Sequence, residues 1–156
     1  MGFAMKSLIQ LSVLGLFLSF VVSIVEVKED VVQQKTIKDM KLKITFSDVE
    51  LIATIYDNPT SRDFVSRLPI TTQLEDYASN EKIFYPEEKL TKEGVPSGYE
   101  PKKGDITYYA PWGDVAIFYK DFNYSTGLIS LGKIEGDGIK KLKNVGNEKV
   151  TFELLK

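Results

Sequence analysis

The side chains that could do chemistry in this chain of 156 residues are limited in kind, because it contains neither cysteine nor histidine. Their absence excludes disulfides, thiol nucleophiles, zinc sites of the usual kinds and every catalytic triad built on histidine. Catalysis would have to rest on arginine, lysine, tyrosine, a carboxylate or a hydroxyl group. Carboxylates could still bind a hard metal ion, but no loop has the alternating oxygen ligands of an EF-hand. We therefore expect no metal and no cofactor.

The most informative aromatic residues lie in the segment 104–122, GDITYYAPWGDVAIFYKDF. Two apolar runs flank the connection 110–113, where proline and glycine favour a turn, so the segment predicts a β-hairpin. Tyr109, Trp112 and Phe118 could line an apolar slot for a ligand, because amphipathic rings are common in binding sites. The competing interpretation is that these rings pack in the core or at the rim of a barrel.

Two arginines, Arg62 and Arg67, complete the candidate ligand-binding set. A guanidinium beside an apolar slot could draw charge from the imide nitrogen of a proline, which is what prolyl isomerisation requires. The alternative is that both arginines pair with nearby carboxylates on a solvated helix face, where an ion pair contributes only about 0–1 kcal/mol to stability.

Three further motifs indicate little chemistry. Glu75 and Asp76 are neighbours on a predicted strand and point to opposite faces, so they cannot form a carboxylate pair. The segment 94–98, GVPSG, lacks the Lys-Ser/Thr ending of a phosphate-binding loop and predicts a turn. The basic cluster 140–143 is typical of a solvated face, although it could contact anionic lipid if a membrane anchor is retained.

Short apolar and alternating runs predict the elements that must position these residues. Asn58 as N-cap and Pro59 as first helical residue begin one short helix, with Phe64, Val65 and Leu68 on one face. The expected strands cover residues 40–46, 49–56, 70–77, 81–85, the two arms of the hairpin, 127–134 and 149–155. About eight short strands and one helix predict a mainly β fold, a small closed antiparallel β-barrel spanning residues 40–156.

The N-terminal residues predict a segment separate from the barrel. Lys6 precedes the uncharged run 7–25, which is typical of a signal peptide or a membrane anchor. As a helix the run would span roughly 28 Å, close to the ~30 Å hydrocarbon core of a bilayer, so cleavage and retention both stay open. The polar segment 26–39 predicts a linker. We expect export to the cell envelope, either periplasmic or extracellular.

The overall composition and charge limit the classes of partner that this chain could bind. Hydrophobic residues make up 43% of the chain and charged residues 27%, which is normal for a globular protein. The net charge of −2 leaves no electrostatic footprint for nucleic acid. We therefore expect no nucleic-acid partner, and membrane contact only through the N-terminal segment.

Three blocks of the sequence, 56–77, 96–122 and 127–137, together resemble bacterial cyclophilin-like fold proteins. The resemblance implies a cyclophilin-type barrel. It does not imply the isomerase activity, because the Phe-His-Arg and Gly-Ser-Gln-Phe-Phe segments and the downstream Trp and His of true prolyl isomerases are missing. No catalytic residue is therefore assigned by the resemblance.

Three functions fit these observations. The first is a non-enzymatic binding module that captures a peptide or small ligand over its aromatic face. The alternative is a divergent peptidyl-prolyl cis-trans isomerase. A third is a structural domain that interacts with another envelope protein.

Overall fold

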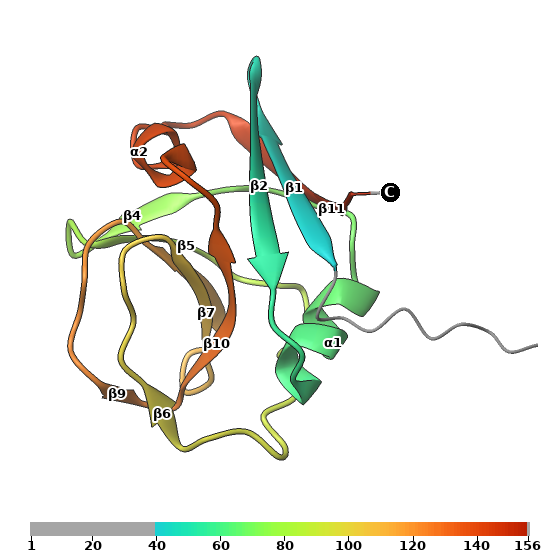
Figure 1. The fold of residues 1–156 in the computed structure, drawn as a ribbon, viewed down its shortest axis with the longest axis vertical. Coiled ribbons are helices and arrows are strands. Elements are labelled where there is room, and N and C mark those ends of the chain that lie inside the picture. Colours follow the sequence, from blue (N-terminus) through green and yellow to red (C-terminus); the bar gives the residue numbers. More distant parts are fainter. Residues whose placement is uncertain (1–39, 156) are drawn as a thin grey trace, which may run out of the picture. The chain divides into compact units, whose positions relative to one another are not determined.

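The computed structural model describes residues 40–155, so the leader or anchor expected at 1–25 and the linker expected at 26–39 lie outside the described residues. The described part is mainly β (Figure 1). In chain order its elements are β1 (Lys41–Phe46), β2 (Val49–Ile55), α1 (Pro59–Ser66), β3 (Ile70–Gln73), β4 (Glu75–Tyr77), β5 (Glu81–Phe84), β6 (Gly98–Tyr99), β7 (Asp105–Tyr109), β8 (Asp114–Phe118), β9 (Ser125–Thr126), β10 (Leu128–Ile134), α2 (Gly138–Leu142) and β11 (Lys149–Leu154).

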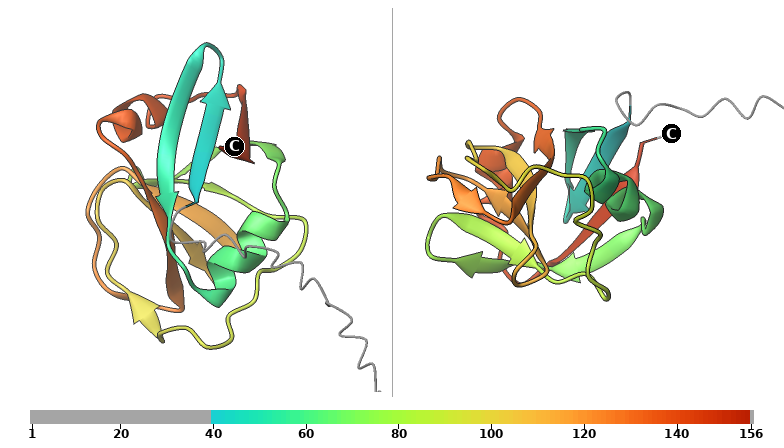
Figure 2. Two further views of the ribbon diagram at one scale, coloured as in Figure 1. Left: turned by 45° about the vertical axis from the view of Figure 1, so that its right-hand side comes forward. Right: turned by 90° about the horizontal axis from the view of Figure 1, so that it is seen from below.

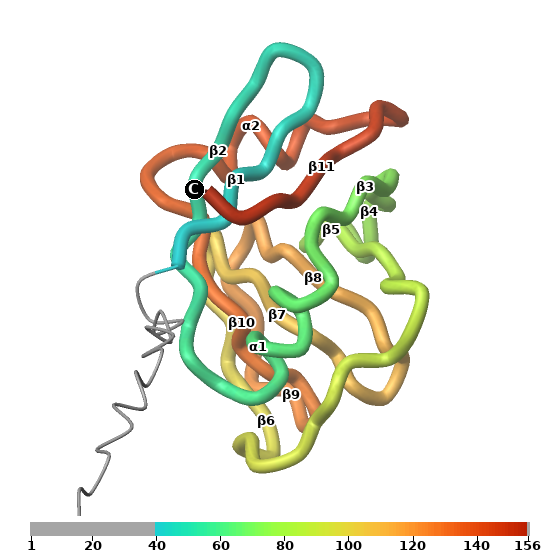
Figure 3. The backbone as a smooth tube through the Cα atoms, turned by 90° about the vertical axis from the view of Figure 1, so that its right-hand side faces the viewer, coloured from blue at the N-terminus to red at the C-terminus, as the bar shows by residue number. Residues whose placement is uncertain are grey.

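Nine strands form one antiparallel sheet in the order β3-β11-β1-β2-β10-β7-β8-β5-β4. The strands at the two ends of this order, β3 and β4, are separated along the chain by Leu74 alone. The segment 70–77 therefore pairs with β11 through its first half and with β5 through its second half. This curls the sheet into a nearly closed barrel (Figure 2, Figure 3). The barrel predicted from the sequence is confirmed.

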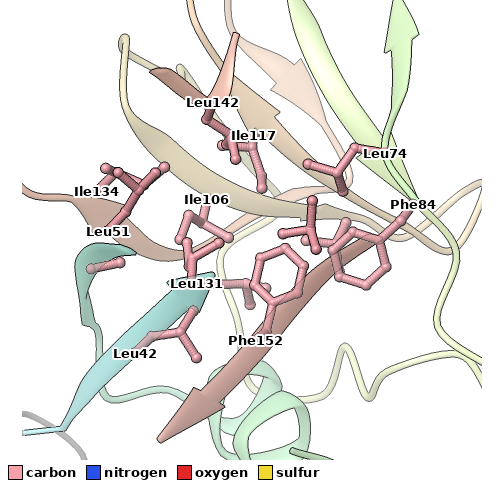
Figure 4. Close-up of a cluster of buried hydrophobic side chains, with 14 of the residues drawn as sticks. Leu42, Leu51, Leu74, Phe84, Ile106, Ile117, Leu131, Ile134, Leu142 and Phe152 are labelled. Atoms are coloured by element: carbon pink, nitrogen blue, oxygen red, sulfur yellow. The ribbon is translucent and has the colours of Figure 1, made fainter. Parts of the chain in front are cut away.

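The barrel interior is filled by every second side chain of its strands, as side-chain alternation requires. The alternating apolar residues of β1, β2 and β11 face inward and are all buried or partly buried: Leu42, Ile44, Phe46, Leu51, Ala53, Ile55, Val150, Phe152 and Leu154. Phe84 of β5 and Phe152 of β11 stack with ring centroids 5.0 Å apart. Leu74 joins the same cluster, so the closing segment is packed from within (Figure 4).

The connections between the strands pack on the barrel in two ways. The segment 86–103 inserts Leu90 into the barrel core, where its backbone amide donates to the Tyr108 hydroxyl at 3.0 Å. Further on, β6 pairs with β9 to form a separate two-stranded ribbon, and β6 contacts β10. These two strands and the division of 70–77 at Leu74 explain why the strands outnumber the eight expected.

The helices also match the sequence in part. Helix α1 begins as predicted, with the Asn58 side chain accepting from the Ser61 amide at 2.9 Å and Pro59 in the first turn. Helix α2 was expected only as a basic segment, yet Ile139 and Leu142 are three residues apart and both are buried. Within residues 40–155, neither helix has the length and apolar character needed to cross a membrane.

Because Phe152 is fully buried and stacked on Phe84, its removal tests the core of the barrel. We expect Phe152→Ala to lower the free energy of unfolding by about 3–5 kcal/mol, the usual loss for a buried phenylalanine. The matched control is Phe122→Ala, a ring that is 47% exposed, with an expected loss of about 1 kcal/mol or less. Urea denaturation of the full chain measures both, and equal losses would contradict this packing.

Candidate functional site

A hollow on the outer face of the barrel brings together three of the five residues singled out from the sequence. We name it the Trp112 hollow, and its volume is about 190 Å³. Its aromatic residues are Tyr77, Tyr109, Trp112, Phe118 and Phe122, and its polar residues include Asn80, Glu81 and Asp114. Ala116 and Leu128 add small and apolar surface. The hollow lies across five consecutive strands of the sheet, in the order β4, β5, β8, β7 and β10.

Strand register determines how the hollow is formed. Side chains alternate along β8, so Asp114, Ala116 and Phe118 share the outer face, while the residues between them join the barrel core. Ala116 is the smallest of the three and leaves space between its two larger neighbours. On the adjacent strands, Glu81 lies opposite Phe118 and Tyr109 lies opposite Asp114.

The turn between β7 and β8 holds Trp112 over this space. The Gly113 amide donates to the Tyr109 carbonyl at 2.8 Å, with Gly113 at a φ of +85° that other residues rarely adopt. Gly127 lies beneath the turn at a φ of +82°, and a Cβ there would meet Pro111 Cδ at 2.8 Å. The close approach needs a glycine, and it keeps the indole ring of Trp112 at the rim.

Three rings meet nearly at right angles at the rim. The ring centroids of Trp112 and Tyr77 are 5.4 Å apart with an interplanar angle of 86°, and those of Trp112 and Tyr109 are also 5.4 Å apart at 77°. Phe118 is buried below and stacks on Phe122 at 6.0 Å. Trp112 remains 49% exposed, so the rim offers ring surface to solvent above a buried apolar base.

Two carboxyl groups belong to the hollow, and neither was singled out from the sequence. Burial, with a further contribution from the charge of Asp114, raises the pKa of Glu81 to about 7. Burial also raises the pKa of Asp114, against a smaller opposing effect of its own backbone amide. The pKa of Glu81 thus lies near neutral pH, and both carboxyl groups respond to any charge that enters the hollow.

Two polar atoms of the hollow are buried without a hydrogen-bond partner. They are Asp114 Oδ1 and Asn80 Nδ2, two of three such side-chain atoms among the described residues. Asp114 is only 3% exposed, so solvent does little to satisfy its carboxylate. Buried polar groups are nearly always hydrogen-bonded, so these two atoms call for a partner such as a water molecule, an ion or a ligand.

The structure places the two predicted arginines elsewhere. Neither Arg62 nor Arg67 lines the Trp112 hollow; both are on or next to α1, and both are paired. Arg62 bonds to Asp57. Arg67 donates two bonds to Asp63, at 2.8 and 3.0 Å, and two more to the carbonyls of Glu88 and Lys89, at 2.6 and 3.1 Å. Arg67 thus ties the loop after β5 to the helix, which is a structural role.

Larger clefts exist, but they offer fewer side chains that are free to bind a ligand. One of about 610 Å³ runs between Arg67 and Tyr85, and another of about 570 Å³ lies beside Lys103 and Glu135. In both, the charged side chains that could act are engaged in ion pairs or face open solvent. Residues 40–155 contain no group of three or more acidic side chains placed to hold a metal ion.

The residues that sequence reasoning missed are Tyr77, Asn80, Glu81, Asp114 and Phe122. The register between two strands could have revealed Glu81. When the strands 81–85 and 114–118 pair, Glu81 lies opposite Phe118 and on the same face of the sheet. A carboxylate that shares a sheet face with apolar rings is a candidate for a raised pKa.

Comparisons with known proteins place the chain by fold. A sequence model of the family described as cyclophilin-like matches residues 44–153. A hypothetical protein from Archaeoglobus fulgidus, solved in solution, is similar in structure with a TM-score of 0.57 and 22% identity, over 74% of this chain and 95% of that one. At this identity the likeness shows the fold alone. No curated protein matches the chain.

The raised pKa of Glu81 predicts a specific pH dependence of stability. The folded pKa of about 7 exceeds the ordinary value of 4.5, so between these pH values the folded state binds more protons than the unfolded state. The contribution of Glu81 to stability is therefore fully present below about pH 4.5 and is lost as the pH rises through 7. We expect the free energy of unfolding of Glu81→Gln, measured relative to that of the wild type, to increase by about 1–3 kcal/mol as the pH rises from 5 to 8.

Urea denaturation at the two pH values measures this difference, and Glu93→Gln, an exposed carboxylate, is the control. The difference between variant and wild type isolates Glu81 from Asp76 and Asp63, whose lowered pKa values act in the opposite direction. A difference that stays constant from pH 5 to pH 8 would contradict the partial burial of Glu81.

Proposed function

The chain belongs to the cyclophilin-like family, and we propose that it is a non-enzymatic binding module that captures a peptide or a small ligand in the Trp112 hollow. One observation carries this proposal. An exposed tryptophan, flanked by two tyrosines, stands over a hollow whose base is a buried apolar cluster separate from the barrel core.

The apolar cluster supports a binding role because it is not needed to fill the barrel. Ile83, Ala116, Phe118 and Leu128 lie on the outer face, and Tyr109 packs against them. Ring surface that continues from such a cluster into solvent supplies both contact area and a polar tip for hydrogen bonding, which is why tyrosine and tryptophan are frequent in binding sites.

The volume of the hollow limits the size of the ligand that it can hold. Pockets for drug-sized ligands usually measure about 300–1,000 Å³, whereas the Trp112 hollow measures about 190 Å³. The volume suits one side chain or a small head group. A peptide would therefore be held by a single anchoring residue, with the rest of its chain lying on the surface.

We also propose that this module acts outside the cytoplasm. The support is the sequence alone, namely Lys6 followed by the uncharged run 7–25 and the polar segment 26–39. The barrel would then meet its ligand in the cell envelope or beyond it.

The binding function can be tested with capped amino acids, that is, the Nα-acetyl methylamides of the twenty amino acids. Together they present to the hollow every side chain that a peptide could offer. We expect at least one of the Nα-acetyl amino acid methylamides, at millimolar concentration, to change the emission of Trp112, the only tryptophan of the chain. Trp112→Ala should weaken that ligand about tenfold by calorimetry, because a well-placed ring contributes about 0.5–1.5 kcal/mol beyond its buried area.

The matched control is Tyr56→Ala, which removes a partly exposed ring that lies outside the hollow. It should leave the affinity unchanged. If no capped amino acid changes the emission of Trp112, or if both variants weaken binding equally, the hollow is not the binding site.

The isomerase alternative makes a separate prediction. Catalysis would need a donor beside the apolar slot, but Arg62 and Arg67 are paired elsewhere. In a protease-coupled assay on proline peptides, we expect micromolar full-length protein to leave the cis-to-trans rate at its uncatalysed value. Acceleration that disappears in Arg62→Ala or Arg67→Ala would overturn this and favour a divergent isomerase.

A further inference from the structure

We propose that the Trp112 hollow binds a primary ammonium group carried on an apolar stem. This chemistry is shared by a lysine side chain in a peptide and by a free alkylamine. The inference rests on the proposed binding function and goes further, because it names the charge and the hydrogen-bonding character of the ligand.

The rings of the hollow suit a cation. A positive charge is attracted to the face of an aromatic ring, and the attraction is strongest for tryptophan. Tyr77 and Tyr109 each stand nearly perpendicular to Trp112, at 86° and 77°. Both tyrosines thus pack edge-to-face with Trp112 rather than parallel to it, and Trp112 remains 49% exposed, which leaves ring surface for a cation.

The charges of the hollow are of one sign. Glu81 and Asp114 line it, and no lysine or arginine is among its lining residues. The carbon stem of Lys89 lies against Gly113, where an added Cβ would meet it at 3.1 Å. However, Lys89 forms no ion pair with Asp114, both of them being described residues. A cation in the hollow would therefore supply the opposite charge that these carboxyl groups lack.

The unpartnered oxygen of Asp114 favours a ligand that donates hydrogen bonds. Asp114 Oδ1 is buried and accepts no hydrogen bond from any residue between 40 and 155. A primary ammonium has three N–H donors, whereas a quaternary ammonium has none. Asn80 Nδ2 is likewise unpartnered and needs an acceptor, which the amide carbonyl of a peptide lysine provides and a free alkylamine does not.

Apolar surface beneath the charges suits the stem. Ala116 and Phe118 are both almost fully buried, and Leu128 completes the base. Long basic side chains lay their methylene groups along apolar surface and keep the charged end near polar groups. The hollow offers both kinds of surface within about 190 Å³.

Several titratable groups face Glu81 and must be counted in any pH dependence. They are Asp114 on β8, the phenols of Tyr77 on β4 and Tyr109 on β7, and Tyr119 just beyond β8. Burial, the hydrogen bond to Asp76 and the nearby carboxylate charges raise the pKa of Tyr119 to about 12, so this phenol stays neutral at ordinary pH. Glu81, with its pKa of about 7, is therefore the group on which the pH dependence between pH 5 and pH 8 is argued.

The direction of the pH dependence follows from charge. Glu81 is protonated at pH 5 and ionised at pH 8, since its pKa is about 7. A bound ammonium favours the ionised carboxylate, so binding releases a proton and the affinity rises with pH across this range. The ammonium of a lysine, with a pKa of about 10.4, stays charged throughout.

The test compares three capped residues that differ only at the end of the side chain: the Nα-acetyl methylamides of lysine, norleucine and Nε-acetyl-lysine. Each is titrated into the full chain by calorimetry, with Trp112 emission as a second readout. We expect lysine to bind about tenfold or more tightly than norleucine at pH 8, and its advantage to shrink about tenfold at pH 5.

Two neutral variants test the carboxyl groups, and n-butylamine tests the source of the ammonium. Glu81→Gln and Asp114→Asn should each weaken the binding of lysine about fivefold to tenfold more than that of norleucine, and Glu93→Gln should change neither. Tighter binding of the capped lysine than of n-butylamine would identify a peptide lysine as the ligand. Equal binding would identify a free amine, and either result supports an ammonium site.

The inference and the function on which it rests can fail separately. Norleucine or Nε-acetyl-lysine binding as tightly as lysine would overturn the ammonium site and leave the binding module in place. Binding of other capped residues, with none of these three, would do the same. Failure of every capped residue to bind would overturn both. The three-ligand comparison uses the wild type alone, so the result does not depend on whether the variants fold.

Discussion

The structure depends on one segment, 70–77, that takes part in both ends of the same sheet. Its first half pairs with β11 and its second half with β5, and Leu74 between them points into the core. Because the two ends of the sheet share a covalent connection, the barrel leaves few unpaired strand edges. The same continuity places Tyr77 at the end of β4, next to Glu81 and beside the Trp112 hollow.

Closure of the barrel has a consequence for the outer face. The inner side chains of β8 complete the core, so the outer ones must be covered by something else or meet solvent. The ribbon of β6 and β9 covers part of this face, and Tyr99 packs on the outer cluster. Cover ends at the rim, where Trp112 and Phe122 are about half exposed. The hollow is thus the part of a second small core that residues 40–155 do not close over.

The sequence allowed the fold to be predicted because its signals are local. Alternation in β1, β2 and β11, the Asn58-Pro59 helix start and the turn around Trp112 each depend on a few adjacent residues. The site depends instead on register between distant segments. Tyr109, Trp112 and Phe118 could be found as neighbours in one hairpin, but Glu81 joins them only through pairing with β8. Arg62 and Arg67 were grouped with the rings by chemical type, although Asp57 and Asp63 lie only five and four residues away from them, and the local pairing expected as the alternative is the one observed.

The central claim is that Glu81 and Asp114 form a desolvated acidic hollow that a cation can neutralise. Carbon-13 NMR titration of the Glu81 side-chain carboxyl, in the free protein and with saturating capped lysine, tests it directly. The account predicts a pKa of about 7 in the free protein and a clear fall once the ammonium is bound. A pKa near the ordinary 4.5 in the free protein, or one that capped lysine leaves unmoved, would contradict it.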